Sequence, residues 1–232
     1  MLTAKLILER FDKDHLLLER REQPSRSFTL GFIQMLYLAH AQIDTGTPYP
    51  MNDITNTARD VDGDGTTAMR TTKANLKIGA SPGNSGMYCS CGELSSINST
   101  LNADTMTIEG EKVGIVAGTG VGVVTPTDYA LGTRIAHGSG ANEFEYGGCE
   151  LLSIAFANPN GEFTIRRYFT NNSGGAITVE EVGIYAVGCL AKGPTGMVWE
   201  SYSFLIARDL TGGVAVANTE LLRVTYVPQI TV

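Results

Sequence analysis

The second half of the chain shows the short apolar and alternating patterns that are typical of β-strands. Residues 163–170 are rich in aromatic and β-branched side chains, which suit a pleated, half-buried surface. Residues 171–175, Asn-Asn-Ser-Gly-Gly, are turn formers, and residues 176–186 then resume the strand pattern. This order predicts a β-hairpin with a longer loop.

Further strand-like runs lie on both sides of this predicted hairpin. The predicted strands are at 112–117, 149–156, 202–207, 214–217 and 221–227, and the predicted turns are at 158–161 and 209–213. No helix-period segment of useful length interrupts the region after residue 162. The pattern therefore predicts a mainly β fold, an antiparallel β-sandwich of roughly eight or more strands.

The first 22 residues predict a second hairpin. The apolar residues that share one strand face are Leu2, Ala4, Leu6 and Leu8. Residues 12–15 predict a turn, residues 16–20 a returning strand, and Pro24 its end, since proline lacks the backbone donor for a ladder. Because a two-stranded hairpin is marginal alone, it either belongs to the core or reaches to a neighbouring subunit.

Residues 27–43 predict the one convincing helix. One apolar face follows helical spacing and comprises Phe28, Phe32, Met35, Leu36, Ala39 and Ile43. The other face is apolar as well and comprises Leu30, Ile33, Tyr37 and Leu38. Ser25 or Ser27 is expected to cap the start. A helix that is apolar all round is buried on both sides, either inside this fold or in a contact between subunits.

Residues 44–84 are polar and rich in Thr, Asn, Asp, Gly and Pro, which predicts a long surface insertion. Such a length without regular structure indicates a functional insertion or a segment ordered by a partner. The expected division is a hairpin and helix at 1–43, a loop-rich insertion at 44–110 and a β-sandwich module at 111–232, which together can also form one domain.

Composition narrows the possible functions. The 232 residues are 43% hydrophobic and 18% charged, with 27 glycines, which is typical of a globular, turn-rich β protein. The net charge of −7 makes binding to nucleic acid a poor expectation. The apolar run at 28–41 is short for a membrane span, and no signal-peptide pattern begins the chain. We expect a soluble protein made in the cytoplasm, with no membrane and no nucleic-acid partner.

Three phrases in the second half carry a family resemblance. They are residues 169–185 (FTNNSGGAITVEEVGIY), 204–210 (FLIARDL) and 222–226 (LRVTY), with a lead-in at 118–120 and 125–131. Together they resemble a β-module that recurs in structural proteins of tailed bacteriophages. The resemblance implies a part of the virion and carries no catalytic signature.

The acidic stretch at 60–65 is the sharpest local motif. Asp60, Asp62 and Asp64 alternate and are followed by Gly65, an arrangement that folds hard oxygen ligands around calcium. The twelfth position is Thr71 in place of the bidentate glutamate of an EF-hand, so that motif is excluded. A simpler calcium loop and a solvated acidic turn both remain open.

The other candidate chemistry has simpler explanations. Cys89 and Cys91 are one residue apart, which fits zinc poorly even with Cys149 and Cys189, so buried thiols are favoured and a disulfide formed after release from the cell stays open. The glycines at 118–122 lack the spacing and the lysine of a phosphate loop.

The remaining charged and titratable residues give no catalytic pattern. Of Arg166 and Arg167, one is expected to be exposed and the other paired with Glu180 or Glu181 across the predicted hairpin. The histidines lie in a turn, in the helix and in a Gly-rich loop, with no nearby pattern of a catalytic triad.

These observations favour a non-enzymatic structural component of a tailed-phage virion, made in the host cytoplasm and associated with the tail, collar or fibre. We expect it to form a homo-oligomer, to contact other virion proteins and to need no cofactor. The alternatives are a capsid decoration protein and a carbohydrate- or receptor-binding module that uses calcium at Asp60, Asp62 and Asp64. An enzyme such as a depolymerase is the least supported class, since no catalytic motif is present.

Overall fold

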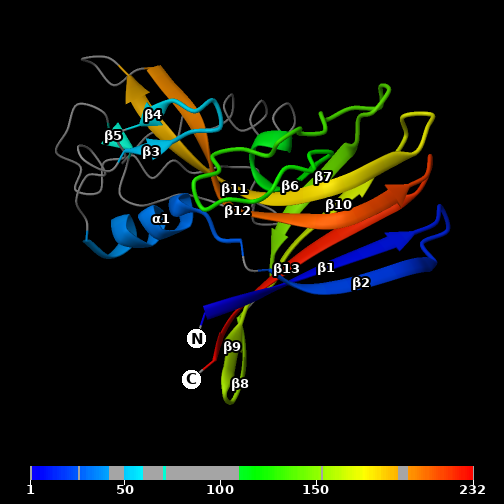
Figure 1. Ribbon diagram of the computed structural model, residues 1–232, viewed down its shortest axis with the longest axis horizontal. Coiled ribbons are helices and arrows are strands. Elements are labelled where there is room, and N and C mark those ends of the chain that lie inside the picture. The colour runs from blue at the N-terminus through cyan, green and yellow to red at the C-terminus, as the bar shows by residue number, and fades with distance from the viewer. Residues whose placement is uncertain are drawn as a thin grey trace.

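A computed structural model describes residues 2–25, 27–41, 50–59, 70–71, 110–152, 154–192 and 198–231. These residues form antiparallel sheets that pack on one another, with one α-helix at the side (Figure 1). The expected mainly β, sandwich-like fold with an N-terminal hairpin and a helix is therefore confirmed. Most of the predicted polar insertion at 44–110 lies outside the described residues.

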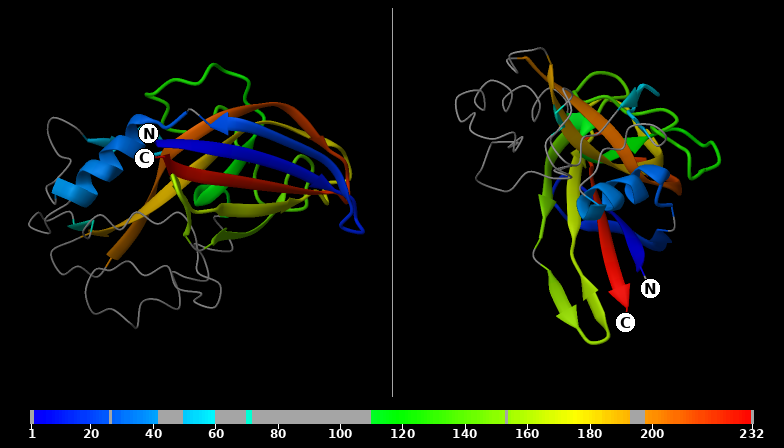
Figure 2. Two further views of the ribbon diagram at one scale, coloured as in Figure 1. Left: turned by 90° about the horizontal axis from the view of Figure 1, so that it is seen from below. Right: turned by 90° about the vertical axis from the view of Figure 1, so that its left-hand side faces the viewer.

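One sheet contains both ends of the chain. Its long strands are β1 (Leu2–Phe11), β2 (Leu17–Ser25), β7 (Glu145–Leu151), β10 (Ile165–Thr170) and β13 (Leu221–Thr231), in the order β2-β1-β13-β10-β7. The short strand β9 (Asn160–Glu162) pairs with the end of β13, and β8 (Ala155–Ala157) pairs with β9. The hairpin β8–β9 projects from the body of the molecule (Figure 2).

The facing sheet is built around one long strand. Its members are β5 (Arg70–Thr71), β6 (Gly114–Gly118), β11 (Ile177–Lys192) and β12 (Val198–Val216), and β11 pairs with each of the others. The remaining elements are the hairpin strands β3 (Met51–Asn52) and β4 (Ala58–Arg59), a 3-10 turn at Gly110–Lys112 and the helix α1 (Leu30–Ala41).

The N-terminal hairpin belongs to the main sheet. β1 pairs with β13 in an unbroken register from Leu2 opposite Ile230 to Phe11 opposite Leu221. Leu6 and Leu8 are buried in the same core as the residues of β11 and β12, as the alternation predicted. Of the two interpretations of the hairpin, the structure therefore shows the first, membership of the core.

The N-terminal hairpin departs from the prediction at one end. β2 passes through Pro24 to Ser25, although the sequence predicted that proline would end it. Proline is tolerated there because β2 is the outer strand of its sheet, where a missing N–H need not break a ladder.

The hairpin predicted from residues 163–186 is wrong. β10 pairs with β13 and β7 in one sheet, whereas β11 pairs with strands of the other sheet. The connection crosses between the sheets, and the buried side-chain amide of Asn171 donates to the carbonyl oxygens of Gly175 and Val216, both at 2.8 Å. Local sequence predicts strand, turn and strand, but it does not say whether the two strands pair.

The turn predicted at 209–213 is also wrong. β12 is one continuous strand of 19 residues. Gly212 and Gly213 have positive φ values of 70° and 78°, and the β11–β12 register shifts between Val179 and Glu181. These features form a bulge, which bends a strand without ending its pairing.

The helix α1 buries one of its two apolar faces. Phe28, Phe32 and Met35 pack on the core, whereas Leu30 and Ile33 are 51% and 58% exposed. The prediction of burial on both sides inside this fold is therefore wrong for the described part of the helix.

The predicted serine caps of α1 are wrong as well. The Ser25 hydroxyl donates to the carboxylate of Asp209 at 2.7 Å. The helix begins at Leu30, and the Thr29 hydroxyl that precedes it donates to the carbonyl oxygen of Leu205 at 2.6 Å.

The outer edge of β12 is covered by the N-terminal part of the chain. Carbonyl oxygens along this edge accept hydrogen bonds from the N–H groups of Ile54 and Thr29 and from the side chains of Gln23, Arg21 and Arg10. An uncovered edge strand is a template for pairing with other chains. Covering this one directs any assembly to other surfaces.

A glycine-to-alanine pair tests the packing between β11 and its neighbours. A Cβ atom at Gly183 would lie 2.8 Å from the Ala207 carbonyl oxygen and within 3.1 Å of the Leu131 and Leu205 side chains. Gly183→Ala is therefore expected to lower the free energy of unfolding by about 1–3 kcal/mol. Gly148→Ala, in a strand position with nothing within 4 Å, is the control and should change it by less than about 0.5 kcal/mol. Equal urea midpoints for both variants would contradict the packing.

Candidate functional site

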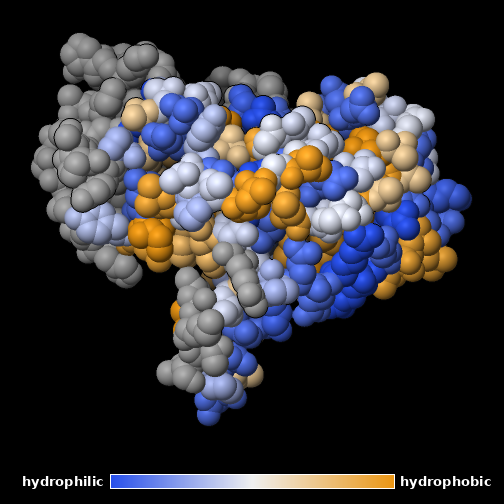
Figure 3. All heavy atoms as spheres, in the orientation of Figure 1, coloured by the Kyte–Doolittle hydropathy of each residue, from blue (hydrophilic) through white to orange (hydrophobic). Residues whose placement is uncertain are grey.

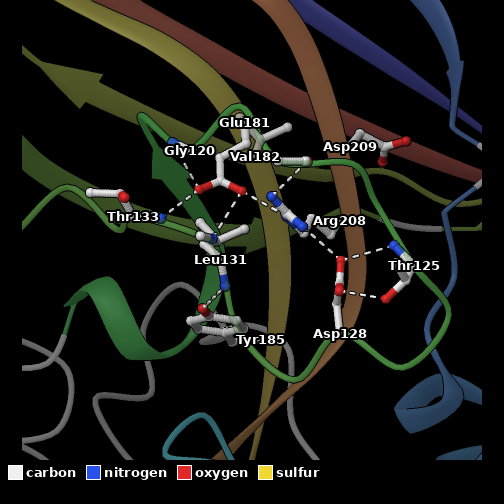
Figure 4. Close-up of polar contacts among 12 residues, drawn as sticks. Gly120, Thr125, Asp128, Leu131, Thr133, Glu181, Val182, Tyr185, Arg208 and Asp209 are labelled. Atoms are coloured by element: carbon white, nitrogen blue, oxygen red, sulfur yellow. Dashed lines mark hydrogen bonds and ion pairs between the residues drawn. The ribbon is translucent and has the colours of Figure 1, made fainter.

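The centre of the candidate site is the buried carboxylate of Glu181 on β11. The residue is 0% exposed and lies between the half-buried Glu180 and the buried Val182. Its oxygens accept hydrogen bonds from the N–H groups of Gly120 at 3.0 Å, Gly132 at 3.1 Å and Thr133 at 2.9 Å, and from Nε of Arg208 at 2.7 Å (Figure 4). A buried carboxylate is tolerated when it is paired and hydrogen-bonded in this way.

Arg208 on β12 connects this carboxylate to a second one. Its Nη1 lies 2.7 Å from Oδ2 of Asp128, and its Nη2 donates to the Gly122 carbonyl oxygen at 3.1 Å. Asp128 in turn accepts hydrogen bonds from the N–H and the hydroxyl of Thr125, at 3.1 and 2.6 Å. The planar guanidinium thus bridges two carboxylates, a geometry that lysine cannot reproduce.

These contacts hold one long loop, residues 119–136, which we call the covering loop. It crosses β11 and β12 on the face turned to the viewer in Figure 1. The buried Leu131 side chain and the hydrogen bond from its N–H to the Tyr185 hydroxyl, at 2.8 Å, add to its attachment. Three backbone N–H groups, one guanidinium and one tyrosine therefore bind the loop to the sheet.

The electrostatics agree with this geometry. Burial alone would raise the pKa of Asp128, but the hydrogen bonds from Thr125 and Arg208 and the charge of Arg208 outweigh it and lower the pKa. Burial would lower the pKa of Arg208, but its two carboxylate partners raise it above its ordinary value. Burial raises the pKa of Tyr185 to about 12, so its hydroxyl stays neutral at physiological pH.

The glycines at 118–122 contact this carboxylate closely. A Cβ at Gly118 would lie 2.7 Å from Glu181 Oε1, and one at Gly120 would collide with the same atom. The stretch therefore offers a backbone N–H to an anion, as a phosphate loop does, but the anion is the protein's own carboxylate.

The covering loop exposes two apolar side chains to a large extent. Val121 is 72% exposed and Val123 is 83% exposed. The N–H of Leu30 donates to the Pro126 carbonyl oxygen at 2.7 Å, which joins the start of α1 to the loop. We call the exposed apolar residues of the two elements the loop–helix surface; they are Val121, Val123, Tyr129, Leu30, Ile33, Leu36 and Tyr37. Figure 3 shows apolar side chains over both elements on one face.

Most of the sequence-predicted site residues are not brought into this site. Asp60, Asp62 and Asp64 lie outside the described residues, as do Cys89 and Cys91. The predicted calcium loop and zinc site therefore stay predictions.

Those of the remaining cysteines and histidines whose side chains the structure describes form no metal-ligating group. Cys189 lies in β11, but its side chain is outside the described residues. Cys149 is buried in the core, where burial raises the pKa of its thiol. His137 accepts a hydrogen bond at Nδ1 from the Tyr146 N–H, at 3.0 Å. Within the ranges that the structure describes, no three His, Cys, Asp or Glu residues form a metal-ligating group.

The predicted pairing of the two arginines on β10 is wrong. Arg166 pairs with Glu150 at 2.7 Å, and Arg167 is buried. The buried guanidinium donates to the carbonyl oxygens of Val113, Ile115 and Gly147. Neither reaches Glu180 or Glu181, because β10 and β11 lie in different sheets.

The sequence contained a signal for the buried carboxylate. Glu180 and Glu181 are adjacent in a strand, and successive side chains of a strand point to opposite faces. Whichever face of the strand is covered, one of the two glutamates must therefore point to it. Nothing in the local pattern identified Arg208 or Asp128 as its partners, since both are distant along the chain.

Comparisons of the chain with protein-family models, with curated proteins and with solved structures gave no match. Among the described residues, no helix has the length and hydrophobicity needed to cross a membrane.

Replacing the buried carboxylate by its neutral isostere should destabilise the fold strongly. In Glu181→Gln, Arg208 loses one charged partner. The side-chain NH₂ group also cannot accept hydrogen bonds from the N–H donors around it, so we expect a loss of about 3–5 kcal/mol in unfolding free energy. Glu180→Gln, at the adjacent half-buried position, is the matched control and should cost less than about 0.5 kcal/mol. Urea unfolding followed by tryptophan fluorescence measures both, and similar midpoints would refute the role of Glu181.

The lowered pKa of Asp128 predicts how the stability of the fold depends on pH. Its pKa is lower in the fold than in the unfolded chain, so its ionised form stabilises the fold at pH values above the ordinary 3.8. This contribution falls as the pH drops below 3.8 and through the lowered pKa of the folded state. The stability difference between the wild type and Asp128→Asn should therefore be constant from pH 7 to about pH 5 and shrink in more acidic buffer. A difference that grows on acidification would contradict the assignment.

Proposed function

We propose that the chain is a non-enzymatic structural component of a tailed-bacteriophage particle, associated with its tail, collar or fibre. It acts through protein–protein contacts made by the loop–helix surface. The observation that carries this proposal is an exposed apolar surface on a loop whose backbone is held by buried charges. Holding a loop in one conformation in this way suits binding, because a rigid loop loses little conformational entropy when a partner binds.

The exposed side chains support a contact with protein. Val123, at 83% exposed, and Ile33, at 58%, lie on two neighbouring elements, which the hydrogen bond from Leu30 to Pro126 joins. Exposed apolar surfaces that are contiguous mark interaction sites, whereas scattered ones carry no such meaning.

The family resemblance supports the assignment to a virion. The phrases that resemble the phage β-module include all three charged members of the site: Asp128 in 125–131, Glu181 in 169–185 and Arg208 in 204–210. They also include Leu131 and Tyr185, which form a further contact of the covering loop. The resemblance therefore includes the residues that hold this loop.

Immunogold labelling of particles tests the proposal. Antibodies raised against the purified chain would be applied to tailed-phage particles from cultures that carry this sequence. Gold on the tail, collar or fibre is the expected result. Labelling of the head would instead favour a capsid decoration protein, and particles without label would contradict a virion role. The alternative of a carbohydrate- or receptor-binding module depends on Asp60, Asp62 and Asp64, so no described contact favours it.

A charge on the loop–helix surface should reduce incorporation into particles. Val123→Asp places a carboxylate where we expect an apolar contact, and a cost of about 1.4 kcal/mol already corresponds to a tenfold weaker contact. Quantitative mass spectrometry of purified particles would measure the copies per particle. Ser139→Asp adds the same charge at an exposed position outside the covering loop and is the control. Equal copy numbers for both variants would contradict the role of the surface.

A further inference from the structure

The projecting hairpin β8–β9 pairs with the end of β13, and we call these three strand segments the arm. On its other side, the end of β13 pairs with the start of β1. Phe156 lies opposite Gly161, and Gly161 lies opposite Ile230, so the three residues share one face of the arm. Phe156 is 75% exposed and Ile230 is 58% exposed. Gly161 has no side chain, and the Phe156 ring lies beside it, since a Cβ at Gly161 would be 3.6 Å from Cδ2 of Phe156.

The other face of the arm has a different character. The neighbouring rows place the small residues Ala155 and Ala157 beside Glu162 and Asn160 on that face. The Glu162 carboxylate there accepts a hydrogen bond from the side chain of Gln229, at 3.0 Å. The arm is therefore apolar on one side and polar on the other. Just before it, Ile154 is 81% exposed.

The arm does not cover its apolar face with its own body. It extends away from the sheets in Figure 1 and in the right-hand view of Figure 2, while the covering loop and α1 lie elsewhere on the molecule (Figure 1). Amphipathic ribbons that project and leave their apolar side in water are expected to bind a complementary surface.

Two other surfaces of the chain suit the arm poorly. On the outer face of the first sheet, Glu9 pairs with Arg223 at 2.6 Å and Arg166 with Glu150 at 2.7 Å. An apolar ribbon would desolvate these ion pairs without replacing their contacts with water. The exposed leucines at 16–18 are limited to the tip of one hairpin, beside charged Lys13 and Asp14.

We propose that the apolar face of the arm binds the loop–helix surface of a second copy of this chain. Both surfaces are apolar, both are exposed, and they lie on different parts of the molecule, so one copy can use them at the same time. Such a contact joins two different surfaces, and its repetition generates a ring or a filament. This inference deepens the proposed function, on which it rests, by naming the first partner of the loop–helix surface.

The size of the arm argues for repetition over an isolated pair. Its two exposed apolar side chains, at roughly 100–200 Å² each, offer about a quarter to a half of the ~800 Å² per partner that a stable interface buries. A copy that both gives and receives an arm gains two such contacts. We therefore expect association that depends on concentration and favours closed or repeating assemblies.

Light scattering on the purified full chain over a concentration series tests the contact. The wild-type mass should rise with concentration, whereas Phe156→Asp and Val123→Asp should each remain at the mass of one chain. Ala157→Asp, on the polar face of the same strand, is the control and should associate as the wild type does. Circular dichroism checks that each variant is folded, which is expected because all three positions are exposed.

Mixing the two variants distinguishes this contact from a symmetric one. Phe156→Asp retains an intact loop–helix surface, and Val123→Asp retains an intact arm. A mixture should therefore form a complex of two chains and nothing larger. An arm–arm contact would instead let Val123→Asp associate on its own, and a contact between two loop–helix surfaces would let Phe156→Asp do so. Either result would overturn the proposal.

Two further results would overturn it. One is a wild type that stays at the mass of one chain at every concentration; if particles still carry gold label, the virion role survives and only the arm contact fails. The other is a loss of association in Leu17→Asp but not in Val123→Asp, which would assign the arm's partner to the hairpin tip.

Discussion

The buried carboxylate of Glu181 is the constraint on which the site depends. It lies inside the fold at a position with no contact to water, where it is stable only because three backbone N–H groups and Arg208 all donate to it. All three N–H groups belong to the covering loop. The same interaction that satisfies the charge therefore determines the path of the loop, and through it the position of the exposed valines.

The fold class could be predicted from the sequence, but the pairing of its strands could not. Alternation correctly placed Leu6 and Leu8 in the core, because the side-chain period of a strand is a local property. The connection at 171–175 contains ordinary turn residues, yet it crosses from one sheet to the other. Whether two neighbouring strands pair is decided by distant partners such as β13, which no local pattern reveals.

The site was less predictable than the fold. The motifs with the sharpest local chemistry, at Asp60–Asp64 and at the paired cysteines 89 and 91, lie outside the described residues, and the site that the structure shows is made by residues far apart in the chain. Asp128, Glu181 and Arg208 are ordinary surface residue types, and only the adjacent pair of glutamates in an apolar strand indicated a buried charge. The apolar second face of the helix predicted a contact beyond the fold, which stays a prediction; in the described part of α1, Leu30 and Ile33 of that face are exposed.

Amide hydrogen exchange of the covering loop tests the central claim most directly. If Glu181 holds the loop, the N–H groups of Gly120, Gly132 and Thr133 should exchange nearly as slowly as those of β11, although they belong to no strand. Other amides of the same loop, such as that of Val123, should exchange much faster. Rapid exchange at all of these positions would show that the buried carboxylate does not hold the loop, and the rigid loop–helix surface would have no physical basis.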